Sequence, residues 1–345
     1  MRRLTQHALF WPAFTLLLLL GACAVFNPSF LRISWHDGHL YGNLIDILNR
    51  AAPLIVVSLG MTLVIAVRGL DISVGAVVAL SATVAAMLVG GGFDAEGMVA
   101  SEHPLWVALG AALAVAAACG LWNGLLVVKA GMQPIVATLI LMVAGRGIAQ
   151  LLTGGQIITV YYPPYFVLGN GFLAGLPLAL WVAAATWGLL HLLTTRSALG
   201  LFIRAIGGNP EAARVAGVRA SAISLCVYTF CGLAAGIAGL ILSSNVKSAD
   251  ANSAGQLLEL DAILAVTLGG TALTGGRFTL AGTILGALII QTLTSMIYSL
   301  GVPTEVNLVV KALLVFAVML LQSAEFRALV MRVARGGAAQ REGAR

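Results

Sequence analysis

Ten apolar runs constrain this chain more than any other feature of its sequence. A run of about 20 apolar residues crosses a bilayer as a helix, because a helix satisfies its own backbone hydrogen bonds in lipid. Charged residues make up only 9% of the chain and the mean hydropathy is +0.99, whereas soluble domains carry about 25% charged residues. The sequence therefore predicts an all-α polytopic membrane protein with about ten transmembrane helices. The runs are 9–27, 51–67, 72–90, 105–127, 134–153, 176–193, 221–243, 260–275, 279–300 and 306–322.

The eighth run, 260–275, is the shortest and contains three glycines near its end, Gly269, Gly270 and Gly275, with Gly276 directly after it. It is either a continuous span or a broken or re-entrant helix, and the sequence leaves this open. Elsewhere, glycines four residues apart lie on one helix face and favour close contact with a neighbouring helix. These pairs are Gly120 with Gly124, Gly232 with Gly236, and Gly282 with Gly286.

The distribution of basic residues orients the predicted spans. With the N-terminus inside, fourteen of the 19 Lys and Arg residues fall on the cytoplasmic side, three fall outside and two lie within spans. This split follows the positive-inside rule and places both termini in the cytoplasm. We therefore expect a multi-pass protein of the bacterial inner membrane. The basic residues lie in short segments between apolar runs, which argues against nucleic-acid binding.

The predicted organisation is a cytoplasmic N-terminus at 1–8, a transmembrane domain at 9–322 and a basic cytoplasmic tail at 323–345. The N-terminal run resembles a signal peptide, and 20–23 resembles a lipoprotein processing site. We interpret it instead as an uncleaved first span. The four cysteines lie inside apolar runs without metal-ligand spacing, so no metal or other cofactor is expected on this chain.

The chain contains neither a phosphate-binding loop nor a nucleophile with a base placed for hydrolysis. The phosphate-binding loop holds nucleotide through its backbone amides and a lysine. We therefore expect a transport subunit rather than an enzyme. If ATP drives transport, ATP and Mg²⁺ must be bound and hydrolysed by a partner.

The predicted cytoplasmic loop 194–220 contains a complete helix signature. Asn209 is a good N-cap, Pro210 suits the first helical position, and Gly217 is a natural stop. Glu211 favours the positive end of the helix, and alanines give strong helix propensity. The short helix is either an ordinary loop helix or a helix that docks into an ATPase partner. The candidate docking residues are Asn209, Pro210, Glu211, Ala212, Ala213, Arg214, Val215, Ala216 and Gly217.

A second candidate feature joins the second and third spans on the cytoplasmic side. Asp71 can cap the third helix, with Ser73 in its first turn. A tight capped turn explains this pattern without a further function. The residues of this turn motif are Gly69, Asp71, Ser73 and Gly75.

Polar residues within or near spans form a third group. A charge in lipid is costly, so each should face protein or a water-filled path. We expect Arg146 to bond exposed carbonyls, and Lys311 to snorkel toward the outer surface. The amides either bond hydroxyl groups of a ligand or join neighbouring helices. The group contains Asn123, Arg146, Gln291, Asn307 and Lys311.

Acidic residues are scarce in the predicted spans. Asp261 lies at a predicted helix end, and Glu259 lies just outside the eighth run. Ion-coupled carriers usually need buried carboxylates, so this scarcity argues against secondary transport.

Several motifs together resemble the ribose-type sugar permeases of ATP-binding cassette (ABC) importers. The resemblance covers about 43–322. Within that family, the segments 45–53, 120–124 and 249–255 resemble galactofuranose permeases. Arg68 departs from the family pattern, which usually has a small or polar residue there. The motif segments are 60–65, 69–75, 134–139, 146–147, 207–218 and 260–266.

The resemblance implies a type II ABC importer-like permease that forms the path for a monosaccharide of the galactofuranose or ribose kind. It also implies two permease subunits, identical or different, two ABC ATPase subunits and a periplasmic sugar-binding protein. The family's interface with the ATPase corresponds to Asn209–Gly217. An ion-coupled sugar carrier is the alternative. The particular sugar and the residues that line the path remain open.

Overall fold

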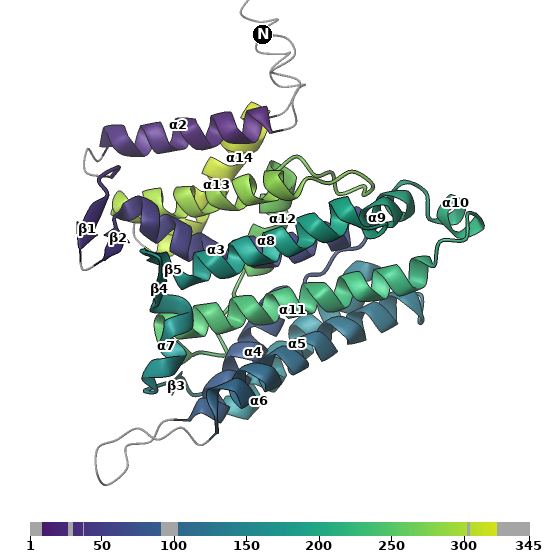
Figure 1. The fold of residues 1–345 in the computed structure, drawn as a ribbon, viewed down its shortest axis with the longest axis horizontal. Helices are drawn as coiled ribbons and strands as arrows, with labels where there is room; N and C mark the ends of the chain where they lie inside the picture. The colour runs from purple at the N-terminus through teal and green to yellow at the C-terminus, as the bar shows by residue number, and fades with distance from the viewer. Residues whose placement is uncertain (1–8, 27–29, 37, 91–102, 302–303, 323–345) are drawn as a thin grey trace, which may run out of the picture.

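The computed structural model describes residues 9–26, 30–36, 38–90, 103–301 and 304–322. The helices form an elongated bundle with a short helix, α10, at one end and paired short strands at the other (Figure 1). These ends are called the α10 end and the hairpin end. The predicted terminal segments 1–8 and 323–345 lie outside the described residues.

Each of the ten apolar runs contains a helix. The helices are α2 (Phe10–Phe26), α3 (Asn43–Ala66), α4 (Val74–Val89), α5 (Leu105–Val128), α6 (Pro134–Thr153), α8 (Leu178–Arg196), α11 (Ala220–Val246), α12 (Leu258–Leu268), α13 (Leu280–Ser299) and α14 (Thr304–Gln322). Six of them, α3, α5, α6, α8, α11 and α13, are long and apolar enough to cross a membrane. The chain is therefore a multi-pass membrane protein, and the full number of ten spans stays a prediction.

Helix α12 shows that the eighth run is not a continuous span. It has 11 residues and ends at Leu268, so at 1.5 Å per residue it covers about 16 Å, roughly half of a hydrocarbon core of about 30 Å. Of the two alternatives that the sequence left open, the structure therefore shows the broken helix. Gly270, Gly275 and Gly276 have φ angles of 86°, 83° and 87°, a left-handed conformation that ends the helix there.

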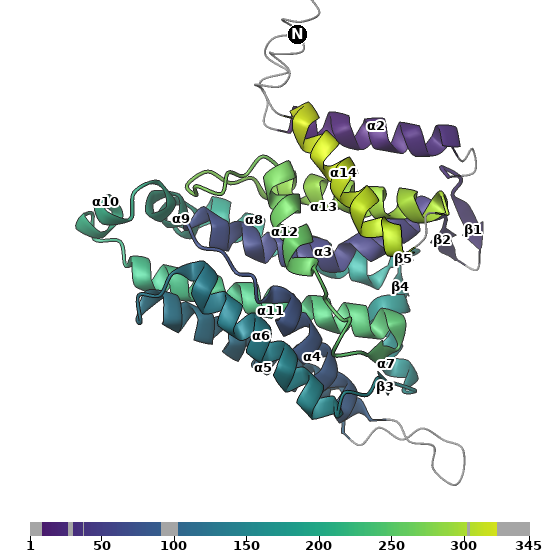
Figure 2. The ribbon, with the colours of Figure 1, turned by 180° about the vertical axis from the view of Figure 1, so that it is seen from behind.

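Helix α3 lies at the centre of the bundle. Every residue from 51 to 66 is buried, and α11, α13, α8 and α12 pack around it. Helix α14 lies on the face of the bundle that is turned toward the viewer in Figure 2, next to α12 and α13. The apolar residues of α3 therefore face protein, whereas Leu121 of α5, Val143 of α6 and Leu189 of α8 are exposed for lipid or a partner subunit.

The paired glycines bring helices into close contact, as their spacing predicted. Gly120 of α5 lies against Gly232 of α11, and a Cβ atom at either position would collide with backbone of the other helix. In the same way Gly286 of α13 packs on the Ala265 backbone of α12. Small residues in membrane helices allow such close backbone approach.

We expect Gly232→Val to destabilise the folded chain by about 1–3 kcal/mol or more, because backbone atoms on α5 cannot move aside as a side chain can. The control is Gly188→Val in α8, where nothing lies within 4 Å of the position that a Cβ atom would take. Thermal unfolding of both purified variants in detergent measures the difference. Equal midpoints for the two variants would contradict the proposed contact.

Short elements cover the hairpin end. The strand pairs are β1 (Ser34–His36) with β2 (His39–Tyr41), β3 (Ile158–Thr159) with β6 (Ser248–Ala249), and β4 (Phe172–Leu173) with β5 (Leu176–Pro177), all antiparallel. Helix α7 (Pro163–Asn170) is fastened to α11 through Tyr165 and Ser243, whose hydroxyl oxygens lie 2.5 Å apart. Burial raises the pKa of Tyr165 to about 12, so its hydroxyl stays protonated and available for this bond.

Candidate functional site

The short helix α10 (Pro210–Val215) projects at one end of the bundle, after α9 (Leu199–Gly208) (Figure 1). The Asn209 side-chain oxygen accepts hydrogen bonds from the backbone N–H groups of Glu211 and Ala212, each 3.1 Å long. Gly217 follows the helix with a φ of 82°. The start and stop signals read from the sequence are therefore confirmed as local structure. The docking role of this helix stays a prediction.

The surface of α10 differs from the one expected. Ala213 was expected to face a partner, but it is only 4% exposed and packs in the core of this chain. All the other residues from 209 to 217 are exposed, and among them Val215 is 82% exposed, with Ala212 and Ala216 as small neighbours. Glu211 and Arg214 form an exposed ion pair of 3.0 Å on the same helix. An apolar residue with small neighbours thus lies at the tip of the molecule.

The turn between α3 and α4 contains two buried polar residues, Asp71 and Ser73. Asp71 is 1% exposed, and one of its carboxylate oxygens accepts bonds from the Ser73 N–H and hydroxyl at 3.0 and 2.6 Å. Asn123 of α5 donates to both side chains, at 3.3 Å to Asp71 and 2.8 Å to Ser73. Asp71 does not cap α4 as expected, because Ser73 occupies the N-cap position. The carboxylate instead links the turn to α5.

The two glycines of this turn motif allow close packing. A Cβ atom at Gly69 would collide with the Tyr228 hydroxyl of α11, and one at Gly75 would collide with the Glu259 carboxylate of α12. Both Asp71 and Glu259 are buried, at 1% and 4% exposure. The molecule thus contains more buried carboxylates than the sequence suggested, although Asp71 already has neighbouring hydrogen-bond donors.

Arg146 bonds exposed backbone carbonyls, as expected. It lies on α6, and one guanidinium nitrogen donates to the carbonyl oxygens of Ala251, Asn252 and Ala254 at 3.1, 3.1 and 2.9 Å. All three carbonyls belong to the non-helical segment before α12. A positive charge is the natural donor for several carbonyls that have no helical partner.

Lys311 does not snorkel freely toward the surface. Its ammonium group lies 2.6 Å from the Asp261 carboxylate, and the two side chains are only 18% and 22% exposed. Asp261 lies in the first turn of α12, at a helix end as predicted, whereas Glu259 is the second residue of this helix and not outside it. The ion pair joins α12 to α14.

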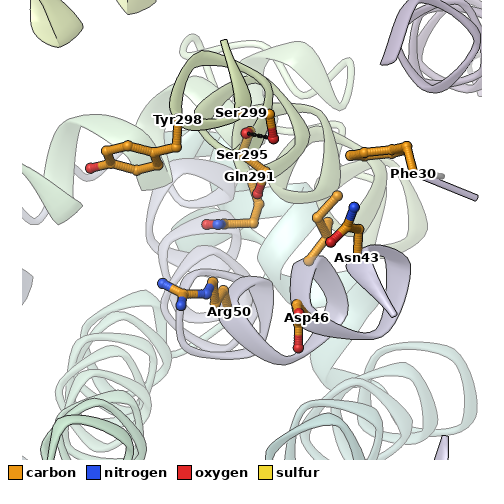
Figure 3. Close-up of a pocket in the computed structure, with 9 residues that line it drawn as sticks. Phe30, Asn43, Asp46, Arg50, Gln291, Ser295, Tyr298 and Ser299 are labelled. Carbon is orange, nitrogen blue, oxygen red and sulfur yellow. Dashed lines mark hydrogen bonds between the residues drawn. The ribbon is translucent and has the colours of Figure 1, made fainter. Parts of the chain in front are cut away.

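Two adjacent cavities open between α3, α11 and α13 at the hairpin end. Their volumes are about 360 and 480 Å³, and Gln291 lines both. Asp46, Arg50 and Tyr298 also line both cavities, and Figure 3 shows Gln291 of α13 opposite Arg50 of α3. Among the predicted polar residues, only Gln291 lines this pair of cavities. Asn123 is buried in the Asp71 network, and the side chain of Asn307 lies outside the described residues.

The sequence interpretation missed Asp46, Asn49 and Arg50 because it started the second span at residue 51. Helix α3 begins eight residues earlier, at Asn43. The polar residues of its first two turns, Asn43, Asp46, Asn49 and Arg50, all line the cavities. The signal was present: these polar residues recur at helical spacing directly before the apolar run.

The fold is that of a multi-pass helical membrane protein, and comparison with known proteins establishes the family. The chain belongs to the family described as the branched-chain amino acid transport system / permease component, which matches residues 43–319. The resemblance to sugar permeases that the motifs indicated is confirmed by individual relatives. No solved structure matches the chain significantly.

Three similar proteins are named as sugar permeases. The chain is 48% identical to the galactofuranose transporter permease protein YtfT of Escherichia coli K12, covering 92% of this chain and 90% of the relative. It is 36% identical to the fructose import permease protein FruF of Bifidobacterium longum, covering 97% and 93%. It is 35% identical to the ribose import permease protein RbsC of Escherichia coli K12, covering 89% and 91%.

Proposed function

We propose that this chain is the membrane-spanning subunit of an ATP-driven importer that carries a monosaccharide of the galactofuranose or ribose kind across the bacterial inner membrane. The similarity to three sugar permeases over 89% or more of this chain carries the proposal. The chain itself is the transport path and not an enzyme. ATP and Mg²⁺ are bound by a partner ATPase, and this chain holds no cofactor of its own.

The proposed orientation places the α10 end in the cytoplasm and the hairpin end in the periplasm. The fourteen-to-three split of basic residues supports it. In this orientation α10 meets the ABC ATPase, and a second permease subunit, identical or different, completes the membrane core. The polar cavities around Gln291 then open toward the side from which a periplasmic binding protein delivers the sugar.

We expect topology reporters fused after residues 40, 100 and 170 to give periplasmic signals, and a reporter after residue 217 to give a cytoplasmic signal. Alkaline phosphatase and green fluorescent protein fusions measure the two sides separately. A strong cytoplasmic signal at any of the first three positions would overturn the ten-span arrangement with both termini inside.

The function is tested by reconstituting the permease with its ATPase and binding protein in proteoliposomes. Uptake of labelled ribose, fructose or galactose is expected to require ATP and the binding protein, and the isolated chain is expected neither to bind nor to hydrolyse ATP. Uptake driven by an ion gradient without ATP would establish the alternative, an ion-coupled carrier. ATP-dependent uptake of an amino acid but no sugar would contradict the substrate class.

A further inference from the structure

The segment 250–257, between β6 and α12, is non-helical backbone within the membrane-spanning bundle. Arg146, which holds three of its carbonyls, is the thirteenth of 20 residues in α6. It therefore lies about 18 Å from one end of that helix and about 10 Å from the other. Helix α12, which follows the segment, is long enough to cross only about half of the bundle's length. Non-helical backbone at such depth occurs only where protein surrounds it or where it lines a water-filled space.

The charged groups around this segment are already engaged. Arg146 is occupied by backbone carbonyls. Asp250 accepts hydrogen bonds from the Asn252 N–H at 2.9 Å and from the Ser253 hydroxyl at 2.5 Å. Glu259, just after the segment, is only 4% exposed, so the exposed groups of segment 250–257 that remain for a ligand are uncharged.

These uncharged groups are amides on an exposed surface. Asn252 and Gln256 are both exposed. Gln150 of α6 donates to the Asn252 side-chain oxygen at 2.6 Å, which leaves the Asn252 amino group directed away from that bond. Within the described residues, the side-chain amide of Gln256 has no hydrogen bond to protein, although its backbone N–H donates to the Ser253 carbonyl. Amide donors and acceptors suit the hydroxyl groups of a neutral ligand and offer no counter-ion to a charged one.

Cavities lie on both sides of the segment. One of about 200 Å³ is lined by Asp250 and Ser253, and it shares Leu242 and Val246 with the 480 Å³ cavity near Gln291. Another of about 470 Å³ is lined by Gln256, and it shares Thr294 and Tyr298 with the same 480 Å³ cavity. The 480 Å³ cavity at the hairpin end therefore adjoins a cavity on each flank of the segment.

We propose that segment 250–257 is a ligand-contacting surface of the transport path, with Asn252 and Gln256 as hydrogen-bonding groups for a neutral polyhydroxyl compound. This inference rests on the proposed function. It adds a site for the transported compound, and the uncharged amides explain why that compound is neutral. Arg146 acts as a positioning residue, because it holds the backbone that presents these amides and does not itself face the ligand.

The first test asks whether the segment faces water. Asn252→Cys and Gln256→Cys are made in a chain with Cys226→Ser, because Cys226 is the exposed cysteine of the described residues. In the assembled complex, both are expected to react with a membrane-impermeant charged thiol reagent. The control is Leu189→Cys, half exposed in the middle of α8, which is expected to stay unreactive. No labelling at either segment position would overturn the proposal.

The second test asks whether the amides recognise hydroxyl groups. Gln256→Leu is expected to lower ATP-dependent uptake of the transported sugar roughly three- to tenfold, the effect of one lost hydrogen bond. For a deoxy analogue that lacks the bonded hydroxyl, Gln256→Leu should lower uptake less than it does for the parent sugar. The matched control is Gln133→Leu, the same change at an exposed residue before α6, with uptake like the wild type.

The outcomes separate the two proposals. If the wild-type complex shows no ATP-dependent sugar uptake, the proposed function fails. If the wild type transports sugar but Asn252→Ala and Gln256→Leu leave both the rate and the preference among deoxy analogues unchanged, only the assignment of this segment fails. The assignment is supported if the variants change the preference among deoxy analogues while sugar-loaded binding protein still stimulates the ATPase normally.

Discussion

Replacing Val215 with Asp is expected to separate the ATPase from the permease while membrane insertion stays normal. Val215 is 82% exposed on α10, beside the small exposed residues Ala212 and Ala216. Burying a valine in a partner's cleft contributes about 1.5–3 kcal/mol, and an unpaired carboxylate there adds a desolvation cost. Association should therefore weaken more than tenfold. Co-purification of the ATPase with the permease, together with sugar uptake, measures the effect.

The matched control is Val167→Asp, because Val167 is a half-exposed valine on another short helix, α7, at the hairpin end. This variant should keep the ATPase bound. Ala216→Trp is a second, steric variant on the α10 surface and should also disrupt association. Normal ATPase recovery with both Val215→Asp and Ala216→Trp would show that the contact lies elsewhere.

Ala213 is not a suitable position for this test. A bulky residue there would overfill the core of the permease itself, because Ala213 is 4% exposed. We expect Ala213→Trp to lower the yield of inserted chain as well as ATPase binding. Loss of both yield and ATPase binding in Ala213→Trp would indicate a folding defect. Val215→Asp should lower only ATPase binding, which indicates a docking defect.

The local structure of α10 could be predicted from sequence because its signals act over a few residues. Asn209 bonds N–H groups two and three positions later, and the left-handed turn at Gly217 needs no distant partner. The apolar runs were equally local, since helix formation in lipid requires only a sufficient apolar length. Which side of α10 faces the core depends on packing, so the burial of Ala213 could not be predicted.

The partners of the charged residues could not be predicted, because they are distant in sequence. Arg146 bonds carbonyls more than 100 residues away, and Lys311 pairs with a residue 50 positions earlier. The sequence indicated that each charge within the membrane needs a partner group, but it did not indicate which residue supplies that group. The same limit applies to Asp71, whose burial follows from the position of Asn123 on a separate helix.

Replacing Arg146 with Met is expected to reduce stability and transport more than replacing Lys311 with Met. The Arg146 guanidinium group bonds three carbonyls of segment 250–257, at 3.1, 3.1 and 2.9 Å. The bonds to Ala251 and Ala254 are partly buried, whereas the bond to Asn252 is exposed. Each buried polar group left without a partner costs about 1–3 kcal/mol, so the total loss should be about 2 kcal/mol or more. No single neighbouring side chain can replace a donor shared by three carbonyls. Thermal unfolding in detergent and sugar uptake provide the two measurements.

Lys311→Met removes one member of a pair and leaves the Asp261 carboxylate unpaired beside α14. Replacing both members by uncharged residues of similar size is often close to neutral, because the desolvation cost of both charges disappears. The double variant Lys311→Met with Asp261→Asn should therefore recover most of the stability lost in Lys311→Met. Adding Asp261→Asn to Arg146→Met should recover none, because Asp261 does not bond the three carbonyls. If Arg146→Met unfolds at the wild-type temperature, or if the Asp261 change rescues it as well as it rescues Lys311→Met, then Arg146 does not hold the segment in the way its contacts indicate.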